Sequence, residues 1–353
     1  MDRPAAKVSA LKLAGLYVGT VVGAGFASGQ EVMQYFGFHG LGGMWGILTA
    51  TALFVLYGAV VMSLGQRLQA ASHREVVQAS GIPWIGTVVD AVITFFLIGV
   101  FSTMAAGSGA VFEERFGVPH YLGSAVIVAL TVVTVVIGFQ GVITAVSFVT
   151  PFLLGSVVVV SLLAILNQPV ELSWAAPERA AVRFWPLSAV TYASYNLVLA
   201  VPMLAPAGTL ADRSTLRQAA VLGGAGLGLG ALAIYLAMST AVPEVAGWDV
   251  PMLFLAGSIA RPLSLAYAAI LLAEVYTTAV TGLYGFAARL ADPKGPRFRA
   301  VVVASGVAGF AGSLLGFSEL VAKVYAAVGF AGYTLLFTLI VAYFRTRTGT
   351  RPA

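Results

Sequence analysis

The chain has 353 residues, of which 59% are hydrophobic and 9% charged, with 19 Lys and Arg, 14 Asp and Glu and no Cys. A soluble domain carries about 25% charged residues, so this composition excludes a soluble enzyme, a nucleic-acid-binding protein and a secreted disulfide scaffold. It predicts an integral membrane protein whose surroundings are the lipid bilayer, and without Cys the chain has no thiol catalysis and no thiolate metal site.

Ten apolar segments reach or approach the length of about 20 residues that a helix needs to cross a bilayer. They cover residues 8–36, 43–66, 84–112, 121–138, 142–166, 185–206, 216–242, 263–288, 299–316 and 321–344. The strict alternation of a membrane β-barrel is absent, and the first segment lacks the cleavage site of a signal peptide. We therefore predict an all-α integral membrane fold, with residues 1–353 forming a single transmembrane domain.

The basic residues predict how these spans are oriented. If the N-terminus is cytoplasmic, 14 of the 19 Lys and Arg fall on the cytoplasmic side, and the other five are Arg115, Arg179, Arg183, Arg261 and Lys323. Seven acidic residues fall on the outer side: Glu113, Glu114, Glu171, Glu178, Glu244, Asp249 and Glu319. Because Lys and Arg near span ends favour the cytoplasm, this asymmetry predicts ten spans with both termini inside.

The first span is rich in glycine and reads GLYVGTVVGAGFASGQEVMQYF from Gly15 to Phe36. Glycines four residues apart are typical of close helix packing, but an unwound stretch at Gly23–Gly25 is the alternative that we favour. Ser28 and Glu31 have the spacing of a capping box, which marks a helix start and so implies an interruption before it. Glu31 is then a helix cap, or alternatively a gate or a proton site.

The sixth span contains a polar stretch from Tyr192 to Asn196, followed by Pro202 and Pro206. This pattern is compatible with a proline-kinked helix whose polar side chains bond to neighbours, or with a second discontinuous helix. Residues 8–167 and 185–345 each hold five spans and begin with an interrupted one, which is typical of the two halves of a transporter. We therefore predict a 5+5 inverted repeat in which helices 1 and 6 are discontinuous.

The eighth span is the most polar one, with Glu274, Thr277, Thr278 and Thr281 on a single helical face. Threonine hydroxyls can simply bond to the preceding turn of their own helix. Alternatively, adjacent hydroxyls and the carbonyls of an unwound helix supply the oxygen ligands that a hard cation such as sodium prefers. Glu274 is also a candidate for binding and releasing a proton. In the third span, Asp90 is expected to pair with an Arg of the cytoplasmic side or to cap a neighbouring helix.

Ten spans, an interrupted first and sixth and a hydroxyl pair in the eighth resemble the LeuT-type fold of the amino acid–polyamine–organocation transporters. The stretch GTVVGAGFASGQEVMQYF, from Gly19 to Phe36, more specifically resembles the YkvI-like bacterial membrane proteins. The resemblance is strong over the first span and rests on topology elsewhere. It implies a secondary transporter in the bacterial plasma membrane that moves a small molecule by alternating access, and not an enzyme.

The resemblance also implies a site between the first, third, sixth and eighth helices. The expected substrate-binding residues are Val22, Gly23, Ala24, Gly25, Phe26, Ser194, Tyr195 and Asn196. The expected sodium ligands are the carbonyls of Gly19 and Val22 and the hydroxyls of Thr277 and Thr278. A Lys that replaces sodium in proton-coupled relatives is missing from the fifth span, and apolar Ala24 and Phe26 argue against a second sodium ion.

Half-helix N-termini carry partial positive charge and suit a substrate carboxylate, so an amino acid or a similar small organic solute is the expected substrate. Sodium is the only expected cofactor, as the coupling ion. Two alternatives stay open: proton coupling through Glu274, with Glu31 as a further candidate, or a receptor of the same fold that senses a solute without transporting it. Neither an HExxH nor a GxSxG motif occurs, so we predict no catalytic residue.

Overall fold

The structure is a computed structural model that describes residues 8–137 and 142–347, and only the backbone for residues 142–148. Arg3, Lys7, Arg351 and Gly138, which entered the predicted topology or spans, lie outside the described residues. All regular structure in the described part of the chain is helical.

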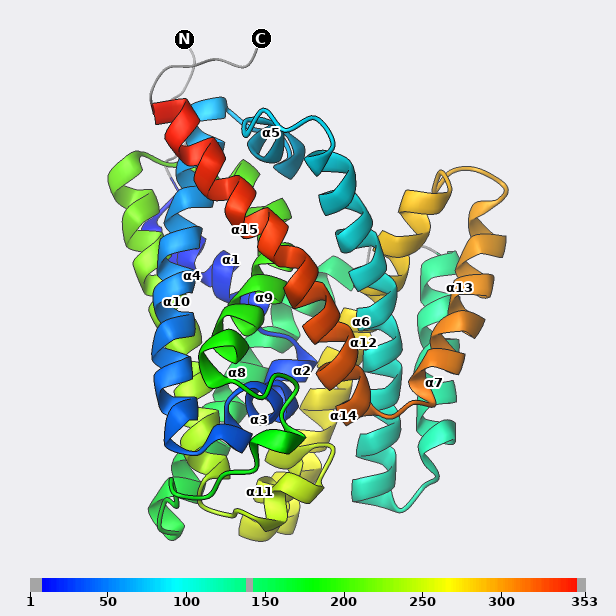
Figure 1. Cartoon of the computed structure of the whole chain (residues 1–353). Helices are drawn as coiled ribbons and strands as arrows, with labels where there is room; N and C mark the ends of the chain where they lie inside the picture. The colour runs from blue at the N-terminus through cyan, green and yellow to red at the C-terminus, as the bar shows by residue number, and fades with distance from the viewer. Residues whose placement is uncertain (1–7, 138–141, 348–353) are drawn as a thin grey trace.

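The N-terminal segment is built from short pieces that lie inside the bundle (Figure 1). Helix α1 covers Ala10–Val21, α2 covers Ala24–Ala27 and α3 covers Gln30–Tyr35, followed by the 3-10 turn Gly37–His39. Between α1 and α2 the chain takes an extended conformation at Val22 and Gly23. A transmembrane run of apolar residues is thus split into helices of which the longest has 12 residues.

Long helices surround this segment. They are α4 (Leu41–Leu68), α6 (Ile85–Phe116), α7 (His120–Ile137), α8 (Val142–Asn167), α9 (Trp185–Ala207), α10 (Arg213–Met238), α12 (Arg261–Leu290), α13 (Phe298–Ser313) and α15 (Ala326–Arg347). Shorter elements connect them: α5 (His73–Gln78), α11 (Pro251–Ile259), α14 (Phe317–Leu320), the 3-10 turns Pro177–Arg179, Gly208–Leu210 and Glu244–Gly247, and a π-helical turn at Val321–Tyr325.

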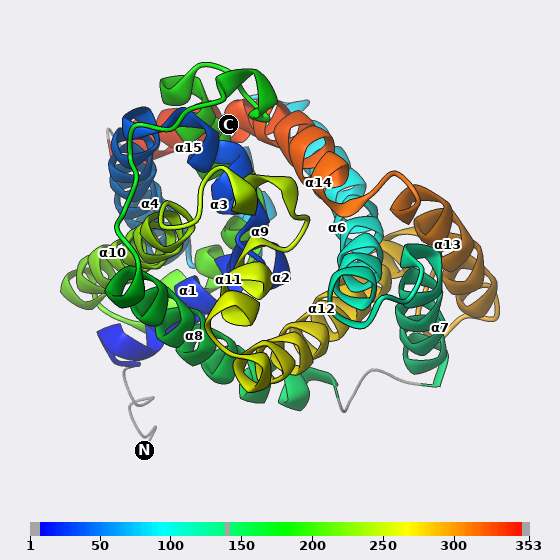
Figure 2. The same ribbon diagram turned by 90° about the horizontal axis from the view of Figure 1, so that it is seen from below.

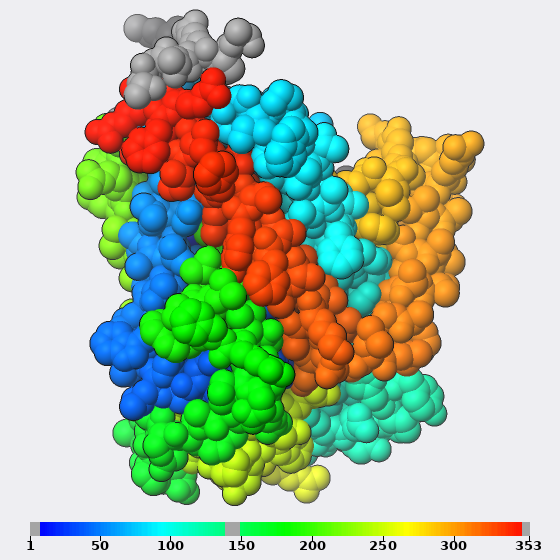
Figure 3. Space-filling view, viewed as in Figure 1, coloured from blue at the N-terminus to red at the C-terminus, as the bar shows by residue number. Residues whose placement is uncertain are grey.

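The long helices are arranged as a ring around α1–α3 and α9, with α7 and α13 outside it (Figure 2). Helix α1 packs against α9 and α10, α4 packs along α9 and α10, and α12 packs along α6. Helix α15 crosses one face of the molecule diagonally (Figure 3), where it contacts α9, α4 and α6. Helices α3, α11 and α14 lie toward the same end of the bundle (Figure 1).

Eight of the helical segments are long and apolar enough to cross a membrane. The remaining two of the ten predicted spans correspond to shorter apolar helices, α1 with 12 residues and α13 with 16. At about 1.5 Å per residue, both are shorter than the helix of about 20 residues that usually crosses a bilayer. For α1 the physical reason is the extended backbone at Val22 and Gly23, which ends the helix within the apolar run.

The predicted interruption of the sixth span is wrong. Helix α9 runs without a break from Trp185 to Ala207, through the polar stretch and both of its later prolines. The Ser194 hydroxyl donates to the Gly329 carbonyl at 2.8 Å, and the Asn196 amide donates to the Tyr192 carbonyl at 3.0 Å. Because neighbouring carbonyls satisfy these polar groups, the helix has no need to open at this point.

Candidate functional site

The break between α1 and α2 leaves backbone oxygens without helical partners. The last carbonyls of a helix have no intrahelical donor, and the amide of Gly23, four residues after Gly19, lies outside α1. A Cβ built on Gly23 would lie 3.8 Å from the Thr278 hydroxyl, so the break faces α12 closely. The structure therefore places the break after α1 beside a threonine of another helix.

Ser28 and Glu31 do not form the predicted capping box. The N-cap of α3 is Gly29, whose φ of 83° lies in the left-handed region. The Ser28 hydroxyl donates to the Gly25 carbonyl at 2.7 Å and accepts from the Gln30 amide at 3.1 Å. The Glu31 carboxylate instead accepts a hydrogen bond from the Tyr195 hydroxyl at 2.6 Å. Glu31 is therefore not a helix cap, because its side chain turns toward α9.

A cavity of about 410 Å³ lies where the interrupted segment faces α6, α9 and α12. Among the described residues, the predicted site residues that line it are Gly19, Val22, Gly23, Ala24, Gly25, Glu31, Tyr195, Asn196, Glu274, Thr277 and Thr278. The structure thus brings together predicted site residues that lie up to 259 residues apart in the sequence, from Gly19 to Thr278. This volume is in the range typical of small-molecule sites, about 300–1,000 Å³.

Two predicted substrate residues are not among the described residues that line the cavity. Phe26 is buried and points toward α10, where a Cβ on Gly230 would meet its ring at 3.1 Å. Ser194 is buried and bonded to Gly329 of α15. Both side chains support the packing of the bundle and do not reach the cavity.

The polar face of α12 borders the cavity as its periodicity predicted. The Thr277 hydroxyl donates to the Glu274 carbonyl at 3.0 Å, and the Thr281 hydroxyl lies 2.9 Å from the Thr278 carbonyl. Glu274 is only 3% exposed and bonds to the Thr150 hydroxyl. Its Oε2 atom is buried and has no hydrogen-bond partner among the described residues.

The sequence did not single out several residues that line the cavity. They are Thr20, Val21, Leu97, Val100, Met104, Leu199, Met203, Gly282 and Tyr325. Most of them are ordinary apolar residues of a membrane helix, and nothing in the local pattern distinguishes a side chain that faces a cavity from one that faces a helix. Tyr325 ends the π-helical turn Val321–Tyr325, a local distortion that is frequent at functional sites but has no sequence signature here.

Asp90 lies away from the cavity and joins three elements. Its Oδ2 lies 2.8 Å from Arg74 Nη2, and its Oδ1 lies 3.1 Å from His73 Nε2 and 3.5 Å from Arg289 Nη1. The expected pairing of Asp90 with an Arg is confirmed. The cluster ties α5 to α6 and α12, which gives Asp90 a structural role.

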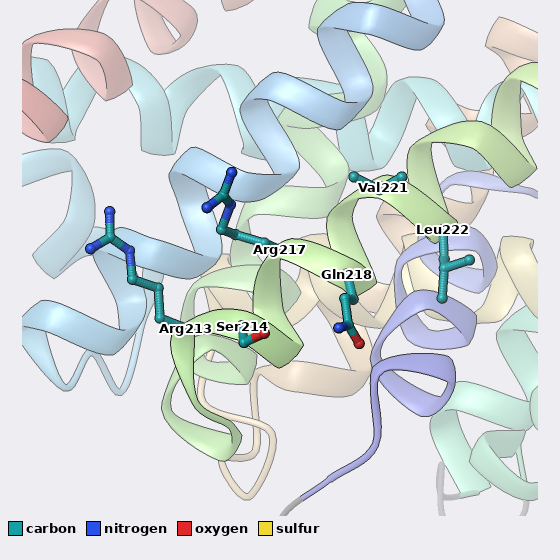
Figure 4. A pocket seen from close by; sticks show the side chains of 6 residues that line it. All are labelled: Arg213, Ser214, Arg217, Gln218, Val221 and Leu222. Atoms are coloured by element: carbon teal, nitrogen blue, oxygen red, sulfur yellow. The ribbon is translucent and has the colours of Figure 1, made fainter.

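A second hollow follows the outer surface of α10 (Figure 4). Its described lining residues all come from the first half of that helix: Arg213, Ser214, Arg217, Gln218, Val221 and Leu222. All six side chains are exposed, and the hollow is not enclosed by other helices as the cavity at the break is. The cavity between α1–α3, α6, α9 and α12 is therefore the candidate functional site.

Comparison with solved structures gives the fold. The chain matches the inward-facing conformation of Mhp1 with a TM-score of 0.65, at 14% identity, over 98% of this chain and 81% of that one. It matches MhsT in complex with L-phenylalanine with a TM-score of 0.61, at 17% identity, over 97% of this chain and 89% of that one. At such low identity these matches show the fold alone, which is the LeuT-type fold.

Comparison of sequences gives the family. No protein-family model matches the chain. The chain is 31% identical over 341 residues to the Bacillus subtilis (strain 168) protein described as "Uncharacterized membrane protein YkvI", covering 95% of this chain and 96% of the relative. The similarity therefore extends far beyond the glycine-rich first span. The chain belongs to the YkvI family of membrane proteins.

Proposed function

We propose that the protein is a secondary transporter that moves a small organic solute across the bacterial plasma membrane by alternating access, coupled to sodium. The observation that carries this proposal is the cavity of about 410 Å³ in which the broken first helix faces the polar face of α12. Discontinuous helices that border a cavity near the middle of the bilayer are where transporters of this architecture bind substrate and ion.

The proposal includes ten membrane crossings. Eight are the long apolar segments, α1–α3 together form a ninth, discontinuous crossing, and α13 is the tenth. With this number both termini lie in the cytoplasm, in agreement with the charge asymmetry. Residues 8–167 and 185–345 are then two repeats of five crossings with opposite orientation.

We assign the sodium site to the carbonyls of Gly19 and Val22 and the hydroxyls of Thr277 and Thr278. All four residues line the cavity. The Thr277 hydroxyl already donates its proton to the Glu274 carbonyl, so its lone pairs remain free to bind a cation. Oxygen atoms are the ligands that a hard cation prefers, and the close approach of Gly23 to the Thr278 hydroxyl, 3.8 Å from a Cβ built on Gly23, supports this assignment.

Sodium-induced thermal stabilisation tests this assignment. An ion that binds the folded state raises its stability by linkage, so sodium should raise the Tm of the purified protein and equimolar potassium should not. The double variant Thr277→Val and Thr278→Val keeps side-chain shape and should lose the sodium effect. Thr49→Val is the matched control, because the Thr49 hydroxyl bonds to the Trp45 carbonyl of its own helix and Thr49 is not among the described residues that line the cavity. If the double variant responds to sodium as fully as the control, the assignment is wrong.

Proton coupling is the second candidate. It is favoured by the buried Oε2 of Glu274, which has no hydrogen-bond partner in the part of the chain that the structure describes. Carboxyls at membrane depth commonly serve as proton relays. In this case a pH gradient drives solute uptake without sodium, and Glu274→Gln abolishes that uptake. If sodium is the coupling ion, Glu274→Gln keeps sodium-driven uptake, so the same variant distinguishes the two mechanisms.

A further inference from the structure

The charged side chains that line the cavity are all acidic. Among the described lining residues, Glu31 and Glu274 are carboxylic acids, and Lys, Arg and His are absent. The ion pairs of the described residues involve Asp90 and Glu319, not these two groups. A buried charge is costly unless a partner of opposite sign neutralises it. The cavity therefore has the electrostatics of a site that receives its positive charge from a ligand.

Glu31 occupies the place where a substrate carboxylate was expected. Its carboxyl group lies so close to Gly25 that a Cβ there would collide with Oε1. The unwound segment thus already has a carboxylate beside it, supplied by the chain. The Tyr195 hydroxyl, 2.6 Å from Oε2, donates a hydrogen bond to this group. A second carboxylate, from an amino acid or an organic acid, would be repelled at this position.

Aromatic rings border the same part of the cavity. Tyr195 and Tyr325 both line it, with ring centroids 5.1 Å apart and ring planes inclined at 54°. The faces of aromatic rings attract ammonium groups, most strongly where water is excluded. Leu97, Val100 and Met104 of α6 add apolar side chains to the lining. The cavity thus offers groups that suit a cation and groups that suit a hydrocarbon body.

Glu274 provides a second, independent indication that the cavity receives a positively charged ligand. This residue is 3% exposed, its Oε2 has no hydrogen-bond partner among the described residues, and its side chain borders the cavity. An unsatisfied acceptor that is buried beside an empty volume is expected to gain a donor when a ligand or an ion enters. Ammonium groups and cations satisfy such an acceptor, and carboxylates do not.

We propose that the substrate is a small organic cation, an amine with an apolar body and without a carboxylate, whose ammonium group binds between Glu31, Tyr195 and Tyr325. This inference rests on the proposed transport function and narrows its substrate class. It replaces the amino acid expected from the sequence, because the chain itself supplies the carboxylate at the unwound segment.

Binding of matched compounds to the purified full-length protein tests the inference. The probes share one skeleton and differ in charge: 2-phenylethylamine, 2-phenylethanol, 3-phenylpropanoate and L-phenylalanine, with a second series built on the isobutyl skeleton of leucine. Isothermal titration calorimetry should give tightest binding for the amine of at least one series and at least tenfold weaker binding for its acid and its amino acid. Tighter binding of the acid or amino acid, or no binding by any amine, overturns the inference.

The variant Glu31→Gln tests whether the charge of Glu31 contributes to amine binding. Glutamine keeps the shape and still accepts a hydrogen bond from Tyr195, so only the charge is lost. We expect at least tenfold weaker amine binding and unchanged binding of the uncharged alcohol. Glu178→Gln is the matched control, because Glu178 is exposed on the 3-10 turn Pro177–Arg179. Amine binding by Glu31→Gln that equals the wild type overturns the role of Glu31.

Flux measurements separate this inference from the proposed function. An amine that binds but never crosses the membrane of proteoliposomes supports the cation site and contradicts the transporter. An amino acid that is carried while amines are not overturns the cation site and leaves the transporter proposal standing. The ligand series on the wild-type protein remains informative even if Glu31→Gln fails to fold.

Discussion

Among single residues, the glycines differ in whether they allow two helices to approach each other closely. A Cβ on Gly65 of α4 would collide with the backbone carbonyl of Ala205 in α9, whereas a Cβ on Gly155 of α8 meets nothing within 4 Å. In lipid, close helix approach through small residues replaces much of the hydrophobic driving force. Gly65 therefore sets the separation of α4 and α9, and Gly155 does not set any such distance.

We expect Gly65→Ala to lower the stability of the protein by about 1–3 kcal/mol, the usual cost of overpacking. The new methyl group pushes against rigid backbone and not against a mobile side chain. Thermal unfolding of the purified protein measures this as a lower Tm. Gly155→Ala, the control, should leave the Tm unchanged or raise it, since Ala favours a helix over Gly by about 1 kcal/mol. Equal effects of the two substitutions contradict the packing argument.

The ionisable residues of the site could be predicted, and its apolar residues could not. Glu31 and Glu274 stand out in a sequence because a charge at membrane depth is expensive and needs a reason. Met203 and Val100 also line the cavity, but an apolar side chain is equally stable against lipid, a helix or a ligand. Only the tertiary arrangement distinguishes these environments.

At the scale of elements, the first and sixth predicted spans show when polar residues interrupt a helix. The glycines at positions 23 and 25 remove side chains that would otherwise support helical backbone, and the chain is extended at Gly23. In α9 the polar side chains of Ser194 and Asn196 bond to carbonyl oxygens, one of them in their own helix. Glycine weakens the helix itself, whereas a polar side chain is compatible with a helix when it finds a hydrogen-bond partner. The sequence does not show whether such a partner lies nearby.

Hydrogen bonds tie the broken segment to α11 and α14, which lie toward the same end of the bundle as α3 (Figure 1). The side-chain amide of Gln30 donates to the Ser318 hydroxyl at 2.6 Å, and Ser318 in turn donates to Asp249. The backbone amide of Met252 donates to the Ser28 carbonyl at 2.9 Å. In the proposed transporter, we interpret these contacts as the closure of the outer side.

Removal of the Ser318 hydroxyl should loosen that side, because it breaks both links that the hydroxyl makes. We expect Ser318→Ala to increase several-fold the rate at which a membrane-impermeant thiol reagent labels Met104→Cys, a cavity position, in intact cells. The control is Ser258→Ala, because the Ser258 hydroxyl bonds to the Leu255 carbonyl within its own helix α11. Labelling rates that do not differ between the two backgrounds argue against an outer closure at Ser318.

At the scale of the whole molecule, the apolar runs and their flanking charges predicted the helix boundaries closely. The spans at 43–66 and 185–206 correspond to Leu41–Leu68 and Trp185–Ala207. The boundaries are predictable because each membrane crossing needs a long apolar run and charged residues are tolerated at its ends. The arrangement of the helices around α1–α3 depends on contacts between distant segments, and the sequence pointed to it only through the family resemblance.

Cysteine labelling tests the orientation, because the chain contains no Cys that would react in the background. Glu178→Cys lies in the predicted outer connection between α8 and α9, and Lys294→Cys lies in the predicted cytoplasmic connection between α12 and α13. In intact cells an impermeant maleimide should label only the first, and both after permeabilisation. The reverse pattern would show that the molecule is inserted with its termini outside.

We propose that the protein carries out ion-driven transport through the cavity at the broken helix. Uptake of radiolabelled small amines and amino acids into proteoliposomes that contain the purified protein tests this proposal. We expect at least one of these solutes to accumulate above its external concentration under an inward sodium gradient, and we expect Thr277→Val with Thr278→Val to abolish this accumulation. Entry of every solute no faster than into protein-free liposomes, under sodium and proton gradients alike, would show that the protein does not transport them.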